Sequence, residues 1–149
     1  MDKRIRNCFI QPLKNNAFPA LFLSGDLGAG KTTLVSELVK LLENGQECEI
    51  ASPSFNICNI YPCTPEIMHW DLYRCGNSVP SELLEALDED KIWNIVEWGE
   101  YVPEKLRPID YLDIKLELNK NMRLLDINGQ GKWGRNAENE LLSIFHTDL

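Results

Sequence analysis

Short apolar runs that stop at a polar residue divide the first two thirds of the chain into predicted strands. The clearest runs lie at 20–23, 66–70 and 92–96, and such runs are typical of strands buried in a sheet. A Ser-Gly pair stops the first run, and an acidic residue follows each of the other two. Two further stretches, 48–51 and 55–61, are also expected to be strands.

A different spacing of the apolar residues predicts the helices. Leucines and valines recur at helical spacing over Lys31–Glu43, and the Asn-Gly pair at 44–45 is expected to end that helix. Ser81–Leu87 is predicted to be a short helix. A final helix is predicted at Ala137–Phe145, with Asn136 as its cap.

Apolar and charged residues alternate strictly in a stretch of the last third of the chain. Leucine and isoleucine alternate with charged residues over 112–118, as in a half-exposed strand. A turn at 119–121 leads into a second stretch at 122–127, so an antiparallel hairpin is expected. Because strands alternate with helices before this hairpin, the predicted fold is α/β, with a mixed, mainly parallel sheet and flanking helices. The 149 residues fit a single domain, 1–149.

Charge and composition narrow the classes of function. The formal net charge is −8, which makes the chain a poor stand-alone nucleic-acid binder, because that affinity depends largely on Lys and Arg. No apolar run approaches the ~18 residues of a membrane span, so no membrane association is expected. The five cysteines include no C-x-x-C pair. They are expected to be reduced thiols in a cytoplasmic protein rather than disulfides or zinc ligands.

One glycine-rich motif carries the strongest chemical signal. The segment Gly25–Thr32 matches G-x-x-x-x-G-K-[ST] at every fixed position, between a predicted strand and a predicted helix. Its glycines let backbone N–H groups turn toward phosphate, and the helix N-terminus favours anionic oxygens. Lys31 is expected to reach the β- and γ-phosphates, and Thr32 to offer its hydroxyl to Mg²⁺. The residues expected to bind the nucleotide are Gly25, Asp26, Leu27, Gly28, Ala29, Gly30, Lys31, Thr32 and Thr33.

Two strand-end carboxylates are candidates for the metal site of a P-loop NTPase-like fold. Asp71 and Glu97 each follow an apolar strand, and such a group lies beside the phosphate loop if its strand is parallel to and near the first. Between the loop and these acids stands Ser54. Its hydroxyl can touch the γ-phosphate, as in switch segments, or belong to an ordinary Ser-Pro turn. His69 shares a strand face with Asp71, and a lone histidine there is more often structural.

These segments together resemble the TsaE family (formerly YjeE), bacterial ATPases of tRNA threonylcarbamoyladenosine biosynthesis. The resemblance rests on the phosphate loop and on S-P-S-F at 52–55, N-I-Y at 59–61, H-W-D-L-Y-R at 69–74 and E-W-G-E at 97–100. The phosphate loop alone is generic, whereas its combination with the last two segments is specific to the family.

The resemblance implies a weak ATPase that binds ATP/ADP with Mg²⁺ and depends on two partners, TsaB and TsaD. The partners attach a threonylcarbamoyl group to adenosine 37 of tRNA, so the chain would reach tRNA only through the complex. By motif position, Lys31 would bind phosphate, and Thr32 and Glu97 would hold Mg²⁺. Ser54 and Asp71 would occupy catalytic, switch-like positions near the γ-phosphate.

Two other functions stay open at this point. A P-loop small-molecule kinase would carry the same loop, but it usually adds an arginine-bearing lid. The arginines here are scattered through the sequence, at Arg74, Arg107, Arg123 and Arg135. A nucleotide-controlled assembly module with negligible turnover is the other alternative. The segment 131–135 is a further candidate for contact with the base or ribose.

Overall fold

The computed structural model describes residues 9–10 and 19–146, and a central sheet organises this part of the chain. Within it, six strands lie in the order β2-β3-β4-β1-β5-β6. The strands are β1 (Ala20–Ser24), β2 (Cys58–Tyr61), β3 (Glu66–Asp71), β4 (Ile92–Glu97), β5 (Tyr111–Asn119) and β6 (Met122–Gln130). The helices are α2 (Lys31–Val39), α3 (Ser81–Leu87) and α4 (Gly131–His146), with single 3₁₀ turns at η1 (Gly45–Glu47), η2 (Gly99–Tyr101) and η3 (Glu104–Leu106).

Strand direction confirms the predicted mixed sheet. The four inner strands, β3, β4, β1 and β5, run parallel, whereas β2 and β6 pair antiparallel at the two edges. The hairpin of β5 and β6 is the one that the alternating pattern predicts. Parallel strands bring their carboxyl ends to one edge of a sheet, which is where ligands bind in open α/β folds.

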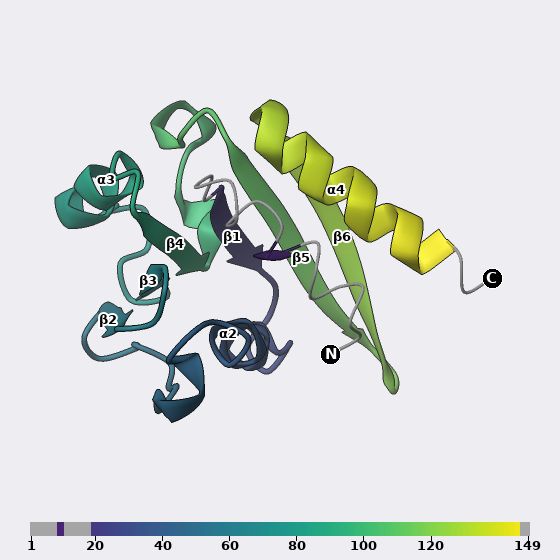
Figure 1. Cartoon of the computed structure of the whole chain (residues 1–149), viewed down its shortest axis with the longest axis horizontal. Coiled ribbons are helices and arrows are strands. Elements are labelled where there is room, and N and C mark those ends of the chain that lie inside the picture. Colours follow the sequence, from purple (N-terminus) through teal and green to yellow (C-terminus); the bar gives the residue numbers. More distant parts are fainter. Residues whose placement is uncertain (1–8, 11–18, 147–149) are drawn as a thin grey trace.

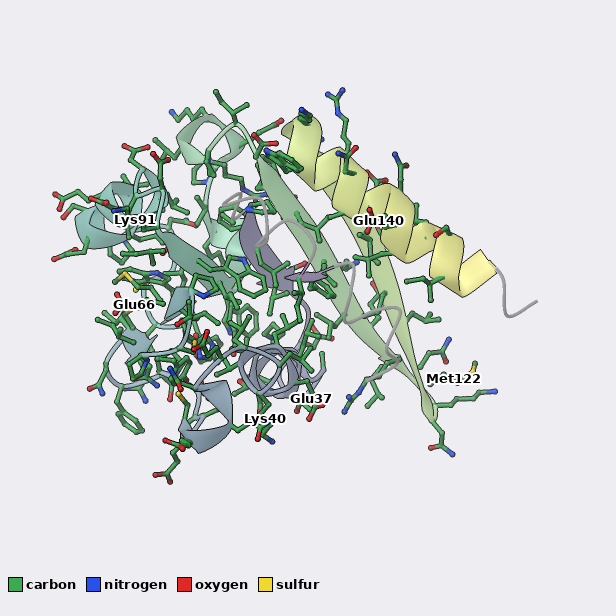
Figure 2. All side chains as sticks on the ribbon, in the orientation of Figure 1. Glu37, Lys40, Glu66, Lys91, Met122 and Glu140 are labelled. Atoms are coloured by element: carbon green, nitrogen blue, oxygen red, sulfur yellow. The ribbon has the colours of Figure 1, made fainter. Side chains whose placement is uncertain are left out.

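Helices cover both faces of the sheet (Figure 1). α2 and α4 bury Val35, Leu38 and Leu141 in one apolar cluster with β1 and β5. α3 buries Leu83 in a second cluster on the opposite face. Figure 1 shows α4 lying along the β5–β6 hairpin, which extends beyond the other strands to a tip far from α3. Met122 projects from this tip (Figure 2).

Two predicted helix boundaries are wrong. α2 ends at Val39 rather than at residue 43, because the N–H of Leu42 bonds back to the Val39 carbonyl in a tighter, three-residue turn. α4 begins at Gly131 rather than at residue 137, so Asn136 lies inside the helix. Its first turn is capped from another part of the chain, since Asp110 accepts a 2.8 Å hydrogen bond from the Trp133 N–H.

The region between α2 and β3 also differs from the prediction. Residues 48–51 form no strand, and β2 begins only at Cys58. Ile57 has a positive φ of 66°, and its N–H donates to the Pro53 carbonyl at 2.7 Å, which closes a turn. The segment is therefore a loop, and it leaves Ser52 and Ser54 beside the carboxyl ends of the parallel strands. No helix among the described residues is long and apolar enough to cross a membrane.

Candidate nucleotide-binding site

The phosphate-loop motif occupies the turn between β1 and α2. Gly25 has a φ of 134°, and a Cβ there would overlap the carbonyl oxygen of Leu116 in β5, so only glycine fits. Gly28 and Gly30 also have positive φ values, 80° and 105°. No side chain caps the N-terminus of α2, which leaves the first backbone N–H groups of the helix for an anion.

Lys31 lies folded against this loop. Its side chain is 5% exposed, and Nζ donates to the carbonyl oxygens of Gly25 at 2.5 Å and Asp26 at 3.0 Å. The indole ring of Trp98, which follows β4, lies 4.2 Å from Nζ, so it attracts and shields the cation. The ammonium group is thus held at the phosphate loop, where a bound phosphate would lie.

Thr32 connects the loop to the end of β4. Its hydroxyl donates a 2.7 Å hydrogen bond to Oε1 of Glu97, a carboxylate that is 3% exposed. β4 lies next to β1, with Glu97 beside Leu23 in the register. A hydroxyl and an acid joined in this way match the donor set that P-loop proteins use for Mg²⁺.

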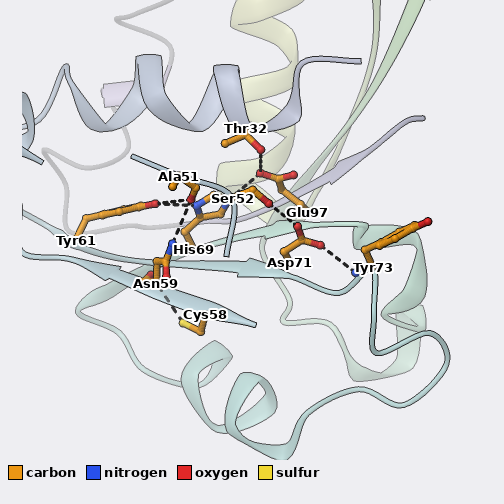
Figure 3. A network of polar contacts seen from close by, with 10 residues as sticks. All are labelled: Thr32, Ala51, Ser52, Cys58, Asn59, Tyr61, His69, Asp71, Tyr73 and Glu97. Carbon is orange, nitrogen blue, oxygen red and sulfur yellow. Dashed lines mark hydrogen bonds and ion pairs between the residues drawn. The ribbon is translucent and has the colours of Figure 1, made fainter. Parts of the chain in front are cut away.

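Asp71 lies one strand further out, directly beside Glu97 in the register of β3 and β4. Its Oδ2 accepts a 2.8 Å hydrogen bond from the Ser52 hydroxyl, and Oδ1 accepts a 3.0 Å bond from the Tyr73 N–H. Figure 3 shows both acids facing the segment that carries Ser52. The two carboxylates therefore share one edge of the sheet but have different partners.

The predicted chemical groups converge on one cavity of about 500 Å³. Its lining includes Lys31, Thr32, Thr33, Ser54, Asp71 and Glu97. The remaining predicted residues of the phosphate loop lie at this cavity or at an adjoining one of about 520 Å³, between the loop and β5.

Two arginines whose roles the sequence left undecided also line this cavity. Arg74 follows β3 and lies over the Phe55 ring at 4.5 Å, and Arg123 reaches in from β6. The guanidinium carbon of Arg123 is 3.1 Å from the point where a Cβ on Gly30 would stand. Nothing in the local sequence places Arg123 at the loop, because the sheet order alone brings β6 there.

Neither Arg107 nor the segment 131–135 lines this cavity. Arg107 has a structural role, since it donates to both oxygens of Asp113 at 2.8 and 2.7 Å and to the Gly99 carbonyl at 2.8 Å. Burial raises the pKa of Asp113, and the adjacent guanidinium opposes that rise. The segment 131–135, a candidate from the sequence for contact with the base or ribose, lies where the parallel strands begin, because Gln130 pairs with Tyr111 at the start of β5. The phosphate loop follows the opposite end of β1.

The donor set fits Mg²⁺ held jointly with a nucleotide. The described residues contain no cluster of three or more His, Cys, Asp or Glu side chains placed to hold a metal by themselves. Mg²⁺ normally takes one or two protein oxygens and completes its shell with phosphate and water. Thr32 and Glu97 supply such a partial shell.

Comparison with known proteins agrees with this geometry. Residues 3–125 match the family model described as "Threonylcarbamoyl adenosine biosynthesis protein TsaE". A relative from Rickettsia prowazekii (strain Madrid E), named tRNA threonylcarbamoyladenosine biosynthesis protein TsaE, is 36% identical over 132 residues, which cover 85% of this chain and 87% of the relative. A protein of the same name from Mycobacterium tuberculosis (strain ATCC 25618 / H37Rv) is 36% identical over 107 residues, 64% of this chain and 61% of that one.

The fold also matches a solved structure. The crystal structure of Bacillus subtilus YdiB aligns with a TM-score of 0.57 and 22% identity, and the alignment covers 100% of this chain and 93% of that one. At this identity the likeness concerns the fold, which is P-loop NTPase-like. The family model and the relatives carry the assignment further: this chain belongs to the TsaE family of tRNA threonylcarbamoyladenosine biosynthesis proteins.

Proposed function

We propose that this chain is an Mg²⁺-dependent ATPase that serves as an accessory subunit for threonylcarbamoylation of adenosine 37 in tRNA. One observation carries the proposal: Lys31 and Thr32 of the phosphate loop line the same cavity as the buried carboxylate of Glu97. Homologues of TsaB and TsaD are the proposed partners. The net charge of −8 suits a subunit that meets tRNA through them. We place the chain, as one domain over residues 1–149, in the cytoplasm.

Phosphate binding is assigned to the loop 25–33. Its backbone N–H groups and the uncapped end of α2 favour anionic oxygens. Lys31 needs only to exchange two loop carbonyls for phosphate oxygens, which suits both ATP and ADP. The backbone donors hold either nucleotide, while the lysine stabilises charge that develops on the transferred phosphoryl group.

Metal binding is assigned to Thr32 and Glu97. Bound Mg²⁺ would supply positive charge to the β- and γ-phosphate oxygens. The hydrogen bond between Thr32 and Glu97 already places the two oxygen atoms that would bind the metal side by side. The protein thereby holds its share of the coordination shell in place before nucleotide arrives.

Asp71 and Ser54 are assigned to the hydrolytic step. The carboxylate of Asp71 accepts hydrogen bonds from Ser52 and Tyr73, yet each of its oxygens has a further lone pair for the attacking water. Ser54 lines the same cavity, where its hydroxyl can contact the γ-phosphate. Positioning of a water by such groups is the usual requirement for nucleotide hydrolysis.

The test is ATP hydrolysis by the purified chain, alone and with its cognate TsaB–TsaD pair, for wild type, Lys31→Ala and Lys40→Ala. Lys40 is exposed and follows α2, so its variant is a matched loss of charge. We expect weak turnover alone, strong stimulation by the pair, and a loss of about 10²-fold or more only in Lys31→Ala.

Other results would contradict specific parts of the proposal. Turnover that is substantial alone and indifferent to the pair would remove the tRNA-modification role while leaving the nucleotide site. Equal rates for wild type and Lys31→Ala would refute the site itself.

A further inference from the structure

A buried chain of polar groups leads away from the metal-site acid and has no part in the function proposed above. His69, in the middle of β3, is 0% exposed. Its Nε2 lies 2.8 Å from Oε1 of Glu97, and its Nδ1 lies 3.1 Å from the hydroxyl of Tyr61 in β2. Figure 3 shows Tyr61, His69 and Glu97 joined in this order, with Thr32 at the Glu97 end.

The first link bears directly on the geometry of the acid. A carboxylate only accepts hydrogen bonds, so Nε2 must carry a proton and donate it to Glu97. The same oxygen, Oε1, also accepts from Thr32. Two donors from different elements therefore fix the orientation of Oε1, and no described residue donates to Oε2. That oxygen is left for the cation or for a water bound to the cation.

The second link reaches the loop between α2 and β2. The Tyr61 hydroxyl lies 3.1 Å from the carbonyl oxygen of Ala51, which also accepts from the Asn59 side chain at 3.1 Å. Desolvation by burial raises the pKa of Tyr61. The neutral hydroxyl has one proton to donate, and both the Ala51 carbonyl and Nδ1 of His69 lie within reach of it. The backbone of this loop is thereby connected to Glu97 through two side chains.

A separate contact connects the same loop to the other acid. Ser52, the next residue after Ala51, donates to Asp71 at 2.8 Å. Loop residues 51–54 are thus attached to both strand-end carboxylates, to one through the backbone and to the other through a hydroxyl. If either carboxylate moves, the loop must move with it to keep these hydrogen bonds.

We infer that His69 is a positioning residue: it orients Glu97 for the divalent cation and, through Tyr61, couples the loop 51–54 to the occupancy of the metal site. The inference rests on the proposed Mg²⁺-nucleotide site. Hydrogen bonds to the ligands of a metal typically control its affinity by about 10–100-fold. His69 cannot itself bind the cation without giving up one of its two partners.

The first experiment measures Mn²⁺ binding to the ADP complex by electron paramagnetic resonance, together with ADP binding in EDTA. We expect His69→Phe to weaken Mn²⁺ binding about 10–100-fold while metal-free ADP binding changes less than about twofold. His69→Gln keeps a donor amide and should recover part of the Mn²⁺ affinity. Tyr111→Phe, which alters a buried tyrosine on the other sheet face, should match wild type.

The second experiment tests the coupling in a variant that keeps His69. Hydrogen exchange of residues 51–54 should slow when ADP and Mg²⁺ bind to wild type. In Tyr61→Phe this slowing should be lost, while Mn²⁺ affinity stays within about threefold, because the contact between His69 and Glu97 survives. Should His69→Phe fail to fold, His69→Gln and Tyr61→Phe still test both links.

The outcomes separate this inference from the proposed function. Wild-type Mn²⁺ affinity in both His69 variants would overturn the positioning role. Equal losses of metal-free and metal-dependent binding would reduce His69 to a structural residue. If ADP and Mg²⁺ slow hydrogen exchange of residues 51–54 as much in Tyr61→Phe as in wild type, the proposed coupling is wrong. A wild-type chain that binds neither ADP nor Mn²⁺ would overturn the proposed function, and this inference with it.

Discussion

Asp71 and Glu97 carry the same chemical group, yet their hydrogen bonds suit them to different tasks. Glu97 is 3% exposed, and one of its oxygens accepts from both Thr32 and His69, so its position is fixed. Asp71 accepts from Ser52, a residue of a loop. A fixed carboxylate suits a metal site, whereas one attached to a loop suits the orientation of water near the γ-phosphate.

At this scale we predict that Asp71→Asn separates binding from turnover. The amide keeps the shape of the side chain but loses the charge and one acceptor, so nucleotide affinity should stay within about threefold. Hydrolysis should fall by about 10²-fold, the lower end of what general acid–base catalysis typically contributes. Single-turnover hydrolysis and equilibrium nucleotide binding measure the two effects.

The matched control for this prediction is Asp90→Asn, at an exposed position before β4. It should alter neither quantity. If Asp71→Asn behaves in the same way as this control, Asp71 has no role in the chemistry.

Among the elements, the turn after β4 does most to shape the site. Trp98 adopts a positive φ of 60°, and the 3₁₀ turn that follows packs against β1. A Cβ on Gly99 would lie 2.6 Å from the Cβ of Phe22, so the turn can approach the strand only with glycine at this position. Arg107 also holds the turn by donating to the Gly99 carbonyl. The indole therefore lies over Lys31.

We predict that Gly99→Ala damages both stability and binding through this element. The added methyl must push the turn away from β1, which should lower the free energy of unfolding by about 1–3 kcal/mol. Because Trp98 moves with the turn, nucleotide affinity should fall as well. Urea denaturation and nucleotide titration measure the two quantities.

Gly76→Ala is the control for that substitution. Gly76 also has a positive φ, 55°, but a Cβ there meets nothing within 4 Å. Its variant should carry only backbone strain of about 1 kcal/mol and leave nucleotide affinity unchanged. A similar loss of affinity in both variants would show that the close contact with β1 is irrelevant to the site.

Over the whole molecule, the cavity depends on segments that are far apart in the sequence. The phosphate loop, the turn after β3 and the outermost strand β6 all contribute to one lining. Lys31, Arg74 and Arg123 bring three positive charges to it, against the two carboxylates of Asp71 and Glu97. In a chain with a net charge of −8, this local positive excess favours a polyphosphate ligand.

We predict that Arg123→Ala weakens ADP and ATP binding by about 10-fold, the loss of one charge-assisted contact. Arg135→Ala is the matched control, because Arg135 is exposed on α4 near the start of β5, at the opposite end of that strand from the phosphate loop. Calorimetric titrations at low and high salt should show a shallower salt dependence only for Arg123→Ala. Equal effects of the two variants would mean that the hairpin does not contact the nucleotide.

The local sequence was sufficient for those features that depend on short-range chemistry. The phosphate loop follows from its own residues, because a backbone that exposes successive N–H groups needs glycines at fixed spacing. The strands that end at Asp71 and Glu97, the helix at Ser81–Leu87 and the C-terminal hairpin follow from the apolar period. These predictions are confirmed.

Only the tertiary structure decided which distant groups meet. The sequence predicted α4 to begin six residues late, because the cap comes from Asp110, a residue outside the helix. It also left His69 as an isolated histidine and Arg123 as a scattered arginine. Their partners, Glu97 and the phosphate loop, are set by the strand order β2-β3-β4-β1-β5-β6. Strand order arises from long-range packing of apolar faces, which no local period encodes.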